Sequence, residues 1–390
     1  WMRSVSRWRE RQTGQRDCCF GQTDMNAAFT TGKEFQKMDP VFGQLSFDDH
    51  EQIVFCYDKD TGLKAIIGIH NTVLGPALGG TRMWNYTSEW EALNDVLRLS
   101  RGMTYKSAIS GLDLGGGKAV IIGDSKKDKN PELIKAFAKY VDSLSGRYIT
   151  AEDVGTTTPD MDLIHTITPH VTGISESLGG SGNPSPVTAY GVYMGLKAAT
   201  KFKYGSDDLN GKKVLVQGIG NVGETLVKHL VNAGALVTIT DISKDRVEEV
   251  AKKYNTAIYM GEDLYSLDVD IYAPCALGAT VNNDSISKLK AQVIAGAANN
   301  QLAEEAVHGK MLQEKGIVYA PDFLINAGGI INVFGEIAKY GSDEAIRRTE
   351  NIYNTTLDIL NLAKEQNITP NQAAMKMAEQ RIEKKKQENK

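Results

Sequence analysis

The stretch that decides the fold runs from residue 213 to residue 241 and reads KVLVQGIGNVGETLVKHLVNAGALVTITD. It opens with an apolar run, Lys213–Gln217, which predicts a buried strand. Apolar residues then recur at helical spacing over Asn221–Ala233, and Leu236–Thr240 has the composition of a second strand. The stretch therefore predicts a strand–helix–strand unit with a glycine-rich turn between its first strand and its helix.

That turn matches the pattern G-x-G-x-x-G, which predicts a dinucleotide site when a strand precedes it and a helix follows. Gly218 permits the tight turn, Gly220 lets the backbone approach a pyrophosphate, and Gly223 lets helix and strand pack closely. Asn221 and Val222 open the helix, whose free N–H groups and dipole favour phosphates. We expect these five residues to bind the cofactor.

The second strand ends in Asp241, 23 residues after Gly218. A carboxylate at this position accepts hydrogen bonds from the ribose hydroxyls and repels a 2′-phosphate. The expected cofactor is therefore NAD, although Lys244 and Arg246 lie near enough to keep NADP open. The alternative is a glycine-rich turn without a cofactor. NAD binding alone defines no reaction, so the chemistry must come from other residues.

Strands and helices alternate along the chain, which predicts an α/β fold of two domains separated by a cleft. An N-terminal α/β substrate domain is expected over 25–186 and a doubly wound, Rossmann-type NAD-binding domain over 187–341, after a Gly/Ser/Pro-rich linker at 178–186. The helical segment 342–390 is expected to pack back on the first domain. Further strands are expected over 53–57, 63–69, 119–122 and 148–151, and helices over 88–103, 131–144 and 187–200.

Composition excludes several classes of function. The chain has 390 residues, with 44 Lys and Arg against 48 Asp and Glu, so no basic excess indicates nucleic acid. No apolar run is long enough to predict a membrane span, and four cysteines without framework spacing favour a cytoplasmic protein. The six histidines show no metal-ligand spacing, so no metal is expected. Residues 1–24 are interpreted as an upstream or non-native extension before a start at Met25, with a transit peptide as the alternative.

Two lysines flank a glycine triplet in the segment SRGMTYKSAISGLDLGGGKAVIIGD. Oxidation of an amine needs a cation for the substrate carboxylate and a base that activates water. Lys106 and Lys118 can divide these tasks, because a lysine beside another cation has its pKa lowered. Asp153 follows a predicted strand and is a candidate for proton transfer, with Glu152 as the competitor. The alternative is a pair of surface lysines without chemistry.

Eight motifs, from about Phe42 to near the C-terminus, resemble the glutamate/leucine/phenylalanine/valine dehydrogenase family and keep its motif order. They are LGPALGGTRMW, SRGMTYK, LGGGKAVIIGD, AEDVGT, NPSPVTAYGV, GIGNVGE, AGAANNQL and INAGGIINV. The resemblance implies that Lys118 is the general base, that Lys106 holds the substrate carboxylate and that Asp153 takes part in proton transfer. It further implies a substrate cleft lined by Gly79 and Gly80, and contacts to cofactor or substrate from Thr188, Asn299 and Asn326.

The side-chain pocket is expected to be apolar. Glutamate-specific members of the family place a lysine where this chain has Leu78, and Ala151 and Val333 are expected to help line the pocket. The resemblance therefore implies NAD-dependent deamination of a branched aliphatic L-amino acid to a 2-oxo acid and ammonia, with leucine the first candidate. Phenylalanine, valine or tryptophan as substrate, or a silent NADH-binding sensor, are the alternatives. The resemblance also implies a homo-oligomer, typically an octamer.

Overall fold

Two β-sheets organise the part of the chain that the computed structural model describes, residues 41–43 and 47–390. The interpretation of residues 1–24 and the start at Met25 lie outside these described residues. Val41–Gly43 form a short 3-10 turn, η1. The described residues from Phe47 to Lys390 belong to a single compact unit, which contains both sheets.

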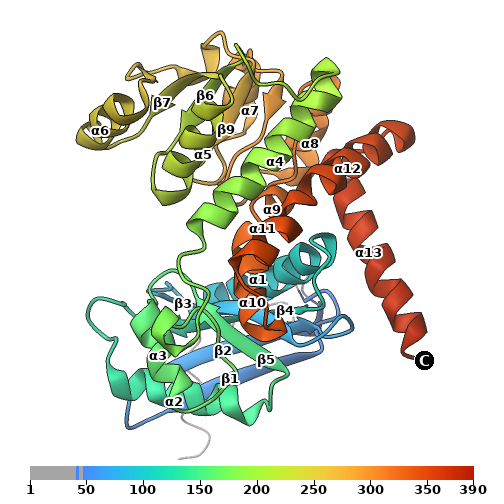
Figure 1. The fold of residues 1–390 in the computed structure, drawn as a ribbon. Helices are drawn as coiled ribbons and strands as arrows, with labels where there is room; N and C mark the ends of the chain where they lie inside the picture. The colour runs from blue at the N-terminus through green and yellow to red at the C-terminus, as the bar shows by residue number, and fades with distance from the viewer. Residues whose placement is uncertain (1–40, 44–46) are drawn as a thin grey trace, which may run out of the picture. The chain divides into compact units, whose positions relative to one another are not determined.

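The first sheet is mixed and has the strand order β1-β2-β4-β3-β5. β1, β2 and β4 pair antiparallel, whereas β3 runs parallel to both β4 and β5. Helix α1 packs on one face, and α2 and α3 lie on the other (Figure 1). The bounds are β1 Gln52–Asp58, β2 Leu63–Asn71, β3 Ala77–Trp84, α1 Glu89–Ile109, β4 Gly115–Ile122, α2 Pro131–Ser143, β5 Tyr148–Glu152 and α3 Thr158–His165.

The elements of this sheet differ from the prediction mainly around glycines. No strand was expected over Ala77–Trp84, and β4 begins at Gly115 rather than at residue 119. The glycine triplet lies inside β4 because α1 crosses it in direct contact. A Cβ on Gly116 would stand 2.1 Å from the backbone nitrogen of Thr104 on α1. The absence of side chains at the triplet is thus a packing requirement of the sheet.

The second sheet is entirely parallel, and its six strands are ordered β8-β7-β6-β9-β10-β11. This is the 3-2-1-4-5-6 order of a Rossmann sheet, so the predicted fold class is confirmed. The strand–helix–strand unit over 213–240 lies at its centre and agrees with the prediction to within one residue. The bounds are β6 Lys213–Gln217, α5 Asn221–Asn232, β7 Leu236–Thr240, α6 Lys244–Tyr254, β8 Ala257–Ile258, η3 Leu264–Ser266, β9 Ile271–Pro274, α7 Asn283–Lys288, β10 Val293–Ile294, α8 Glu305–Glu314 and β11 Val318–Tyr319.

The remaining helices connect the segments that carry the two sheets. The turn η2 (Glu176–Leu178) leads into the long helix α4 (Ser185–Tyr204), which packs against α5, α10 and α12. The others are α9 Asp322–Ile325, α10 Gly328–Ala338, α11 Ser342–Glu350, α12 Ile352–Gln366 and α13 Pro370–Glu388.

Helix α13 packs against α1 through hydrogen bonds as well as side-chain contact. Arg381 donates to the carbonyl oxygens of Ala108 and Leu112, at 3.0 and 2.7 Å, within and just beyond the last turn of α1. The end of the chain therefore braces the helix that carries Lys106. Among the helices described, none is both long and apolar enough to span a membrane.

Candidate functional site

A cavity of about 590 Å³ collects residues from distant parts of the sequence. It is lined by strands of the first sheet, by α1, and by the segments around Asn299, α9 and α10. Of the predicted site residues it brings together Leu78, Gly79, Gly80, Lys106, Lys118, Asp153, Asn299 and Val333. Ala151, expected beside an apolar pocket, also lines it.

The middle of β4 holds Lys118 in a fixed place at this cavity. Its backbone pairs with Gly68 of β2, and only 6% of the residue is exposed. Its ammonium forms an ion pair with the Asp153 carboxylate, which follows the carboxyl end of β5. The neighbouring Glu152 instead accepts a hydrogen bond from Thr158 Oγ1 at 3.0 Å. The geometry therefore joins Lys118 to Asp153 rather than to the competing carboxylate.

The electrostatics of this pair keep the lysine reactive and the aspartate ionised. Burial lowers the pKa of Lys118 from its ordinary value, and the attraction of Asp153 offsets this only in part. Burial works to raise the pKa of Asp153, but the charges of Lys118 and Arg82 overcome it and hold that pKa below its usual value. A lysine with lowered pKa beside a carboxylate is suited to move a proton near neutral pH.

Lys106 projects from the last turns of α1 towards the same cavity. Its Nζ donates to Asn326 Oδ1 at 2.6 Å, across 220 residues of sequence. Burial lowers the pKa of Lys106 to about 8; the nearby Asp322 carboxylate opposes this shift and the charge of Lys118 adds to it. The two lysines thus act on each other electrostatically, as the sequence predicts.

The two predicted asparagines continue from Lys106 as a hydrogen-bonded chain. Asn326 Nδ2 donates to Asn299 Oδ1 at 2.8 Å and to the carbonyl oxygen of Ala297 at 3.1 Å. Because Asn326 donates its amide hydrogens to Asn299 and Ala297, its side-chain oxygen must face Lys106. Asn299 is exposed at the cavity, so this series of hydrogen-bonded side chains links Lys106 to the cavity wall.

The glycine-rich turn has the geometry of a phosphate-binding turn. Gly218 has φ 94°, which favours glycine, and a Cβ on Gly223 would stand 2.0 Å from the carbonyl oxygen of Gly218. A Cβ on Gly220, in contrast, would meet nothing within 4 Å. Gly220 is also the N-cap of α5 and offers no side-chain acceptor to the first N–H groups of the helix. The turn therefore packs closely against the protein at Gly218 and Gly223 and is open at Gly220, where a pyrophosphate fits.

Asp241 is tied to this turn from the end of β7. Its carboxylate accepts hydrogen bonds from the backbone N–H of Ile219 at 2.9 Å and of Ser243 at 3.0 Å. Arg246, which kept NADP open in the sequence, forms ion pairs with Glu224 and Glu249. The charge of Arg246 is therefore already compensated by carboxylates.

Some of the predicted residues do not line the lysine cavity. Neither the glycine-rich turn nor Asp241 lines it, and Val222 packs partly into the core. Thr188 lies on α4 with its Oγ1 donating to the carbonyl oxygen of Pro184 at 2.9 Å, and Pro184 does line the cavity. Among the described residues no group of three His, Cys, Asp or Glu side chains is arranged to hold a metal ion.

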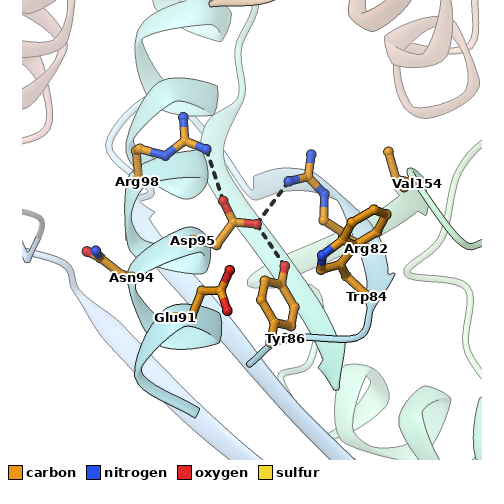
Figure 2. Close-up of a pocket in the computed structure, with 8 residues that line it drawn as sticks. All are labelled: Arg82, Trp84, Tyr86, Glu91, Asn94, Asp95, Arg98 and Val154. Carbon is orange, nitrogen blue, oxygen red and sulfur yellow. Dashed lines mark hydrogen bonds and ion pairs between the residues drawn. The ribbon is translucent and has the colours of Figure 1, made fainter. Parts of the chain in front are cut away.

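Sequence reasoning missed a set of polar residues next to Asp153. Arg82 on β3 forms ion pairs with both Asp153 and Asp95, and Tyr86 donates to Asp95 (Figure 2). A signal was present, because Arg82 is a lone charge within the strand LGGTRMW, where its neighbours Thr81 and Met83 are buried. Since that segment was not predicted to be a strand, its significance could not be seen.

Comparison with known proteins finds relatives over most of the chain. A family model described as "Glu/Leu/Phe/Val dehydrogenase, dimerisation domain" matches residues 50–170, and one described as "Glutamate/Leucine/Phenylalanine/Valine dehydrogenase" matches 179–244 and 240–389. The chain is 56% identical over 343 residues to a leucine dehydrogenase of Bacillus subtilis, covering 88% of this chain and 94% of that protein.

More distant relatives act on other amino acids. An L-tryptophan dehydrogenase of Nostoc punctiforme is 48% identical over 333 residues, covering 85% of this chain and 93% of that protein. The crystal structure of an L-tryptophan dehydrogenase from the same organism superposes with a TM-score of 0.79 at 46% identity, covering 87% of this chain and 97% of that one. The chain therefore belongs to the glutamate/leucine/phenylalanine/valine dehydrogenase family.

Proposed function

We propose that this chain is an NAD-dependent dehydrogenase that oxidatively deaminates a branched aliphatic L-amino acid, with L-leucine preferred. The observation that carries the proposal is the placement of Lys106 and Lys118 in one cavity with Asp153, beside Leu78 and the paired glycines. The cavity offers a cation for a carboxylate, a buried amine paired with a carboxylate, and an apolar wall.

The glycine-rich turn fits NAD. The open space at Gly220, the uncapped N-terminus of α5 and the Asp241 carboxylate correspond to the pyrophosphate and the ribose. NAD, when bound, supplies the acceptor for the hydride that leaves the substrate Cα. We assign Gly218, Gly220, Asn221, Val222 and Gly223 to this site, together with Asp241 and the more distant Thr188, Asn299 and Asn326.

The side chains of the cavity perform the remaining steps. The ammonium of Lys106 binds the α-carboxylate, which replaces the Asn326 oxygen as its partner. Loss of hydride from Cα of the neutral amine leaves an iminium, and the neutral amine of Lys118 takes a proton from the water that attacks it. Asp153 stabilises the resulting charge on Lys118 and relays that proton from the lysine ammonium to the departing nitrogen. One amino acid, one NAD⁺ and one water give the 2-oxo acid, ammonium, NADH and a proton.

Leu78 and Val333 supply the choice of side chain. Leu78 is 2% exposed at the cavity wall, and a charged substrate side chain would lose its hydration there without gaining a partner. A difference of one methylene is worth only about 1–3 kcal/mol in such a pocket, so valine and isoleucine also react. The high identity to the Bacillus subtilis enzyme supports leucine over tryptophan or phenylalanine.

We further propose that residues 25–186 act as the substrate domain, with 342–390 packed on it, and 187–341 as the NAD domain. We also propose that eight copies of the chain assemble into a homo-octamer. Light scattering on the purified protein measures the mass of the assembly, and a stable monomer would contradict the octamer.

One assay tests the proposed activity. NADH formation is measured on a panel of L-amino acids that includes leucine, valine, isoleucine, phenylalanine, tryptophan and glutamate, and is repeated with NADP. We expect the largest kcat/KM with leucine and NAD. Faster turnover of an aromatic amino acid would replace leucine as the substrate. NADH binding without ammonia-dependent reduction of any 2-oxo acid would indicate a sensor.

A further inference from the structure

We propose that Arg82 is a positioning residue for the Lys118–Asp153 pair, and that Asp95 holds Arg82 in that role. The proposal rests on the function proposed above and adds to it a layer of residues that do not touch the substrate. Arg82 Nε lies 3.4 Å from Asp153 Oδ2, while its Nη1 lies 2.9 Å from Asp95 Oδ2. One guanidinium therefore spans two carboxylates, one at the reacting pair and one behind it.

The carboxylate of Asp95 is itself fixed from three sides. Tyr86 OH donates to its Oδ2 at 2.7 Å, and Arg98 Nη2 donates to its Oδ1 at 2.9 Å from the next turn of α1 (Figure 2). Only 15% of the Asp95 side chain and 24% of the Arg82 side chain are exposed. A bond to a well-held carboxylate leaves the planar guanidinium few orientations, so its other edge stays directed at Asp153.

Arg82 also stands between two cavities. The cavity drawn in Figure 2, of about 480 Å³, is lined by Arg82, Tyr86, Asp95 and Val154 among others, and Arg82 also lines the cavity that holds Lys118. Shortening this side chain would join the two spaces and admit water behind Asp153. The residue thus contributes both its charge and its volume to the environment of the pair.

The charged groups around Lys118 define what Arg82 does to proton transfer. Asp153 from the end of β5 and Asp95 from α1 favour the protonated lysine, and Arg82 from β3 opposes it. Lys106 on α1 lies within the same field. Loss of the guanidinium charge removes the cation that opposes protonation, so the pKa of Lys118 and the pKa of Asp153 both rise.

The test uses two variants of Arg82 in the full-length protein. Arg82→Met keeps much of the volume and removes the charge, and we expect the acid limb of the kcat/KM profile to move about one pH unit higher. Arg82→Lys restores a positive charge without the planar, forked guanidinium group. The pH profile of kcat/KM should therefore return towards that of the parent, while kcat stays about tenfold below the parent value. KM for the amino acid should change little, because Arg82 does not bind the substrate.

Asp95→Asn tests the second half of the proposal. It leaves Arg82 in place without its charged anchor, so kcat should fall less than in Arg82→Met. The matched control is Lys197→Met on α4, which removes a partly buried cation of similar exposure, paired with Asp207, that lines neither cavity. The control should lower Tm and leave the pH profile unmoved, which separates positioning from general destabilisation.

A second readout keeps the inference independent of the proposed activity. The pH dependence of Lys118 acylation by an amine-reactive reagent, followed by peptide mass spectrometry, reports the lysine directly. Arg82→Met should move half-modification of Lys118 to higher pH, whether or not the protein turns over leucine. Unchanged midpoints in both the kinetic and the acylation profiles would overturn the inference. An inactive parent protein with a shifted acylation midpoint would overturn only the proposed function.

Discussion

The two sheets prepare their sites by opposite means. At the parallel sheet the binding groups belong to the backbone, as N–H groups at the start of α5 and a turn from which side chains are missing. At the mixed sheet they belong to side chains, the buried Lys118 and the half-buried Asp153 and Arg82, each compensated by the next. The site at the parallel sheet depends on positions without side chains, and the site at the mixed sheet depends on side chains from distant positions in the sequence. Substitutions should therefore act differently at the two sheets.

The largest expected effect is at the side-chain site. Lys118→Ala removes the proposed base and leaves Asp153 without its main partner, so kcat should fall by about 10²–10⁴-fold. NADH binding, measured by fluorescence titration, should remain close to that of the parent, because the backbone site is untouched. Retained turnover would remove Lys118 from the role of base.

A charge placed on the apolar wall should have the next largest effect. Leu78→Lys puts an ammonium where the leucine side chain is expected to pack, and we expect kcat/KM for leucine to fall by about 10²-fold. A parallel series with glutamate checks whether the new charge recruits an acidic side chain. Leucine kinetics equal to those of the parent would show that residue 78 does not contact the substrate.

The backbone site makes a sharper contrast between two glycines. Gly220→Ala meets no protein atom and should leave Tm unchanged, but its methyl group occupies the space for the pyrophosphate, so NADH should bind about tenfold more weakly. Gly223→Ala meets the carbonyl of Gly218 and should cost about 1–3 kcal/mol of stability. Equal effects of both on Tm would mean that the turn is not open at Gly220.

The smallest expected effect is on the pH dependence of stability. The pKa of Lys106 is about 8 in the folded state, against the ordinary lysine value of 10.5 in the unfolded chain. Between these two pH values the unfolded state therefore binds more protons. Lys106 therefore adds to the free energy of unfolding as pH rises through this window. Urea denaturation at several pH values should show the parent gaining on Lys106→Met from pH 8 to pH 10. A constant difference would contradict the lowered pKa.

The comparison also explains what could be predicted from sequence. The parallel unit over 213–240 was predicted almost residue by residue, because strand, glycine turn and helix are consecutive and each has a local signature. At the mixed sheet β3 was missed, because Pro76, Gly79 and Gly80 are typical of a loop. Helix α1 was expected to end at Met103, yet it continues to Ile109, since packing against β4 outweighs the local cost of Gly102.

The functional residues follow the same division. Lys106, Lys118 and Asp153 were predicted through motifs, but which lysine pairs with Asp153 was not, because Lys118 and Asp153 are 35 residues apart, and Glu152 remained a competitor. Only the path of β5 decides which carboxylate meets the lysine. Arg82 and Asp95 were not predicted, since β3 was missed and no local pattern brings a residue of that strand beside one in the second turn of α1.

The glycine triplet of β4 has a consequence for redesign. With no side chain at Gly116, α1 rests closely on the strand, and a side chain there would push apart the helix and the strand that carry the two lysines. The proposed specificity wall at Leu78 and Val333 lies on other elements, β3 and α10. We therefore expect that one chemistry can be fitted to different amino-acid side chains by local replacement at that wall.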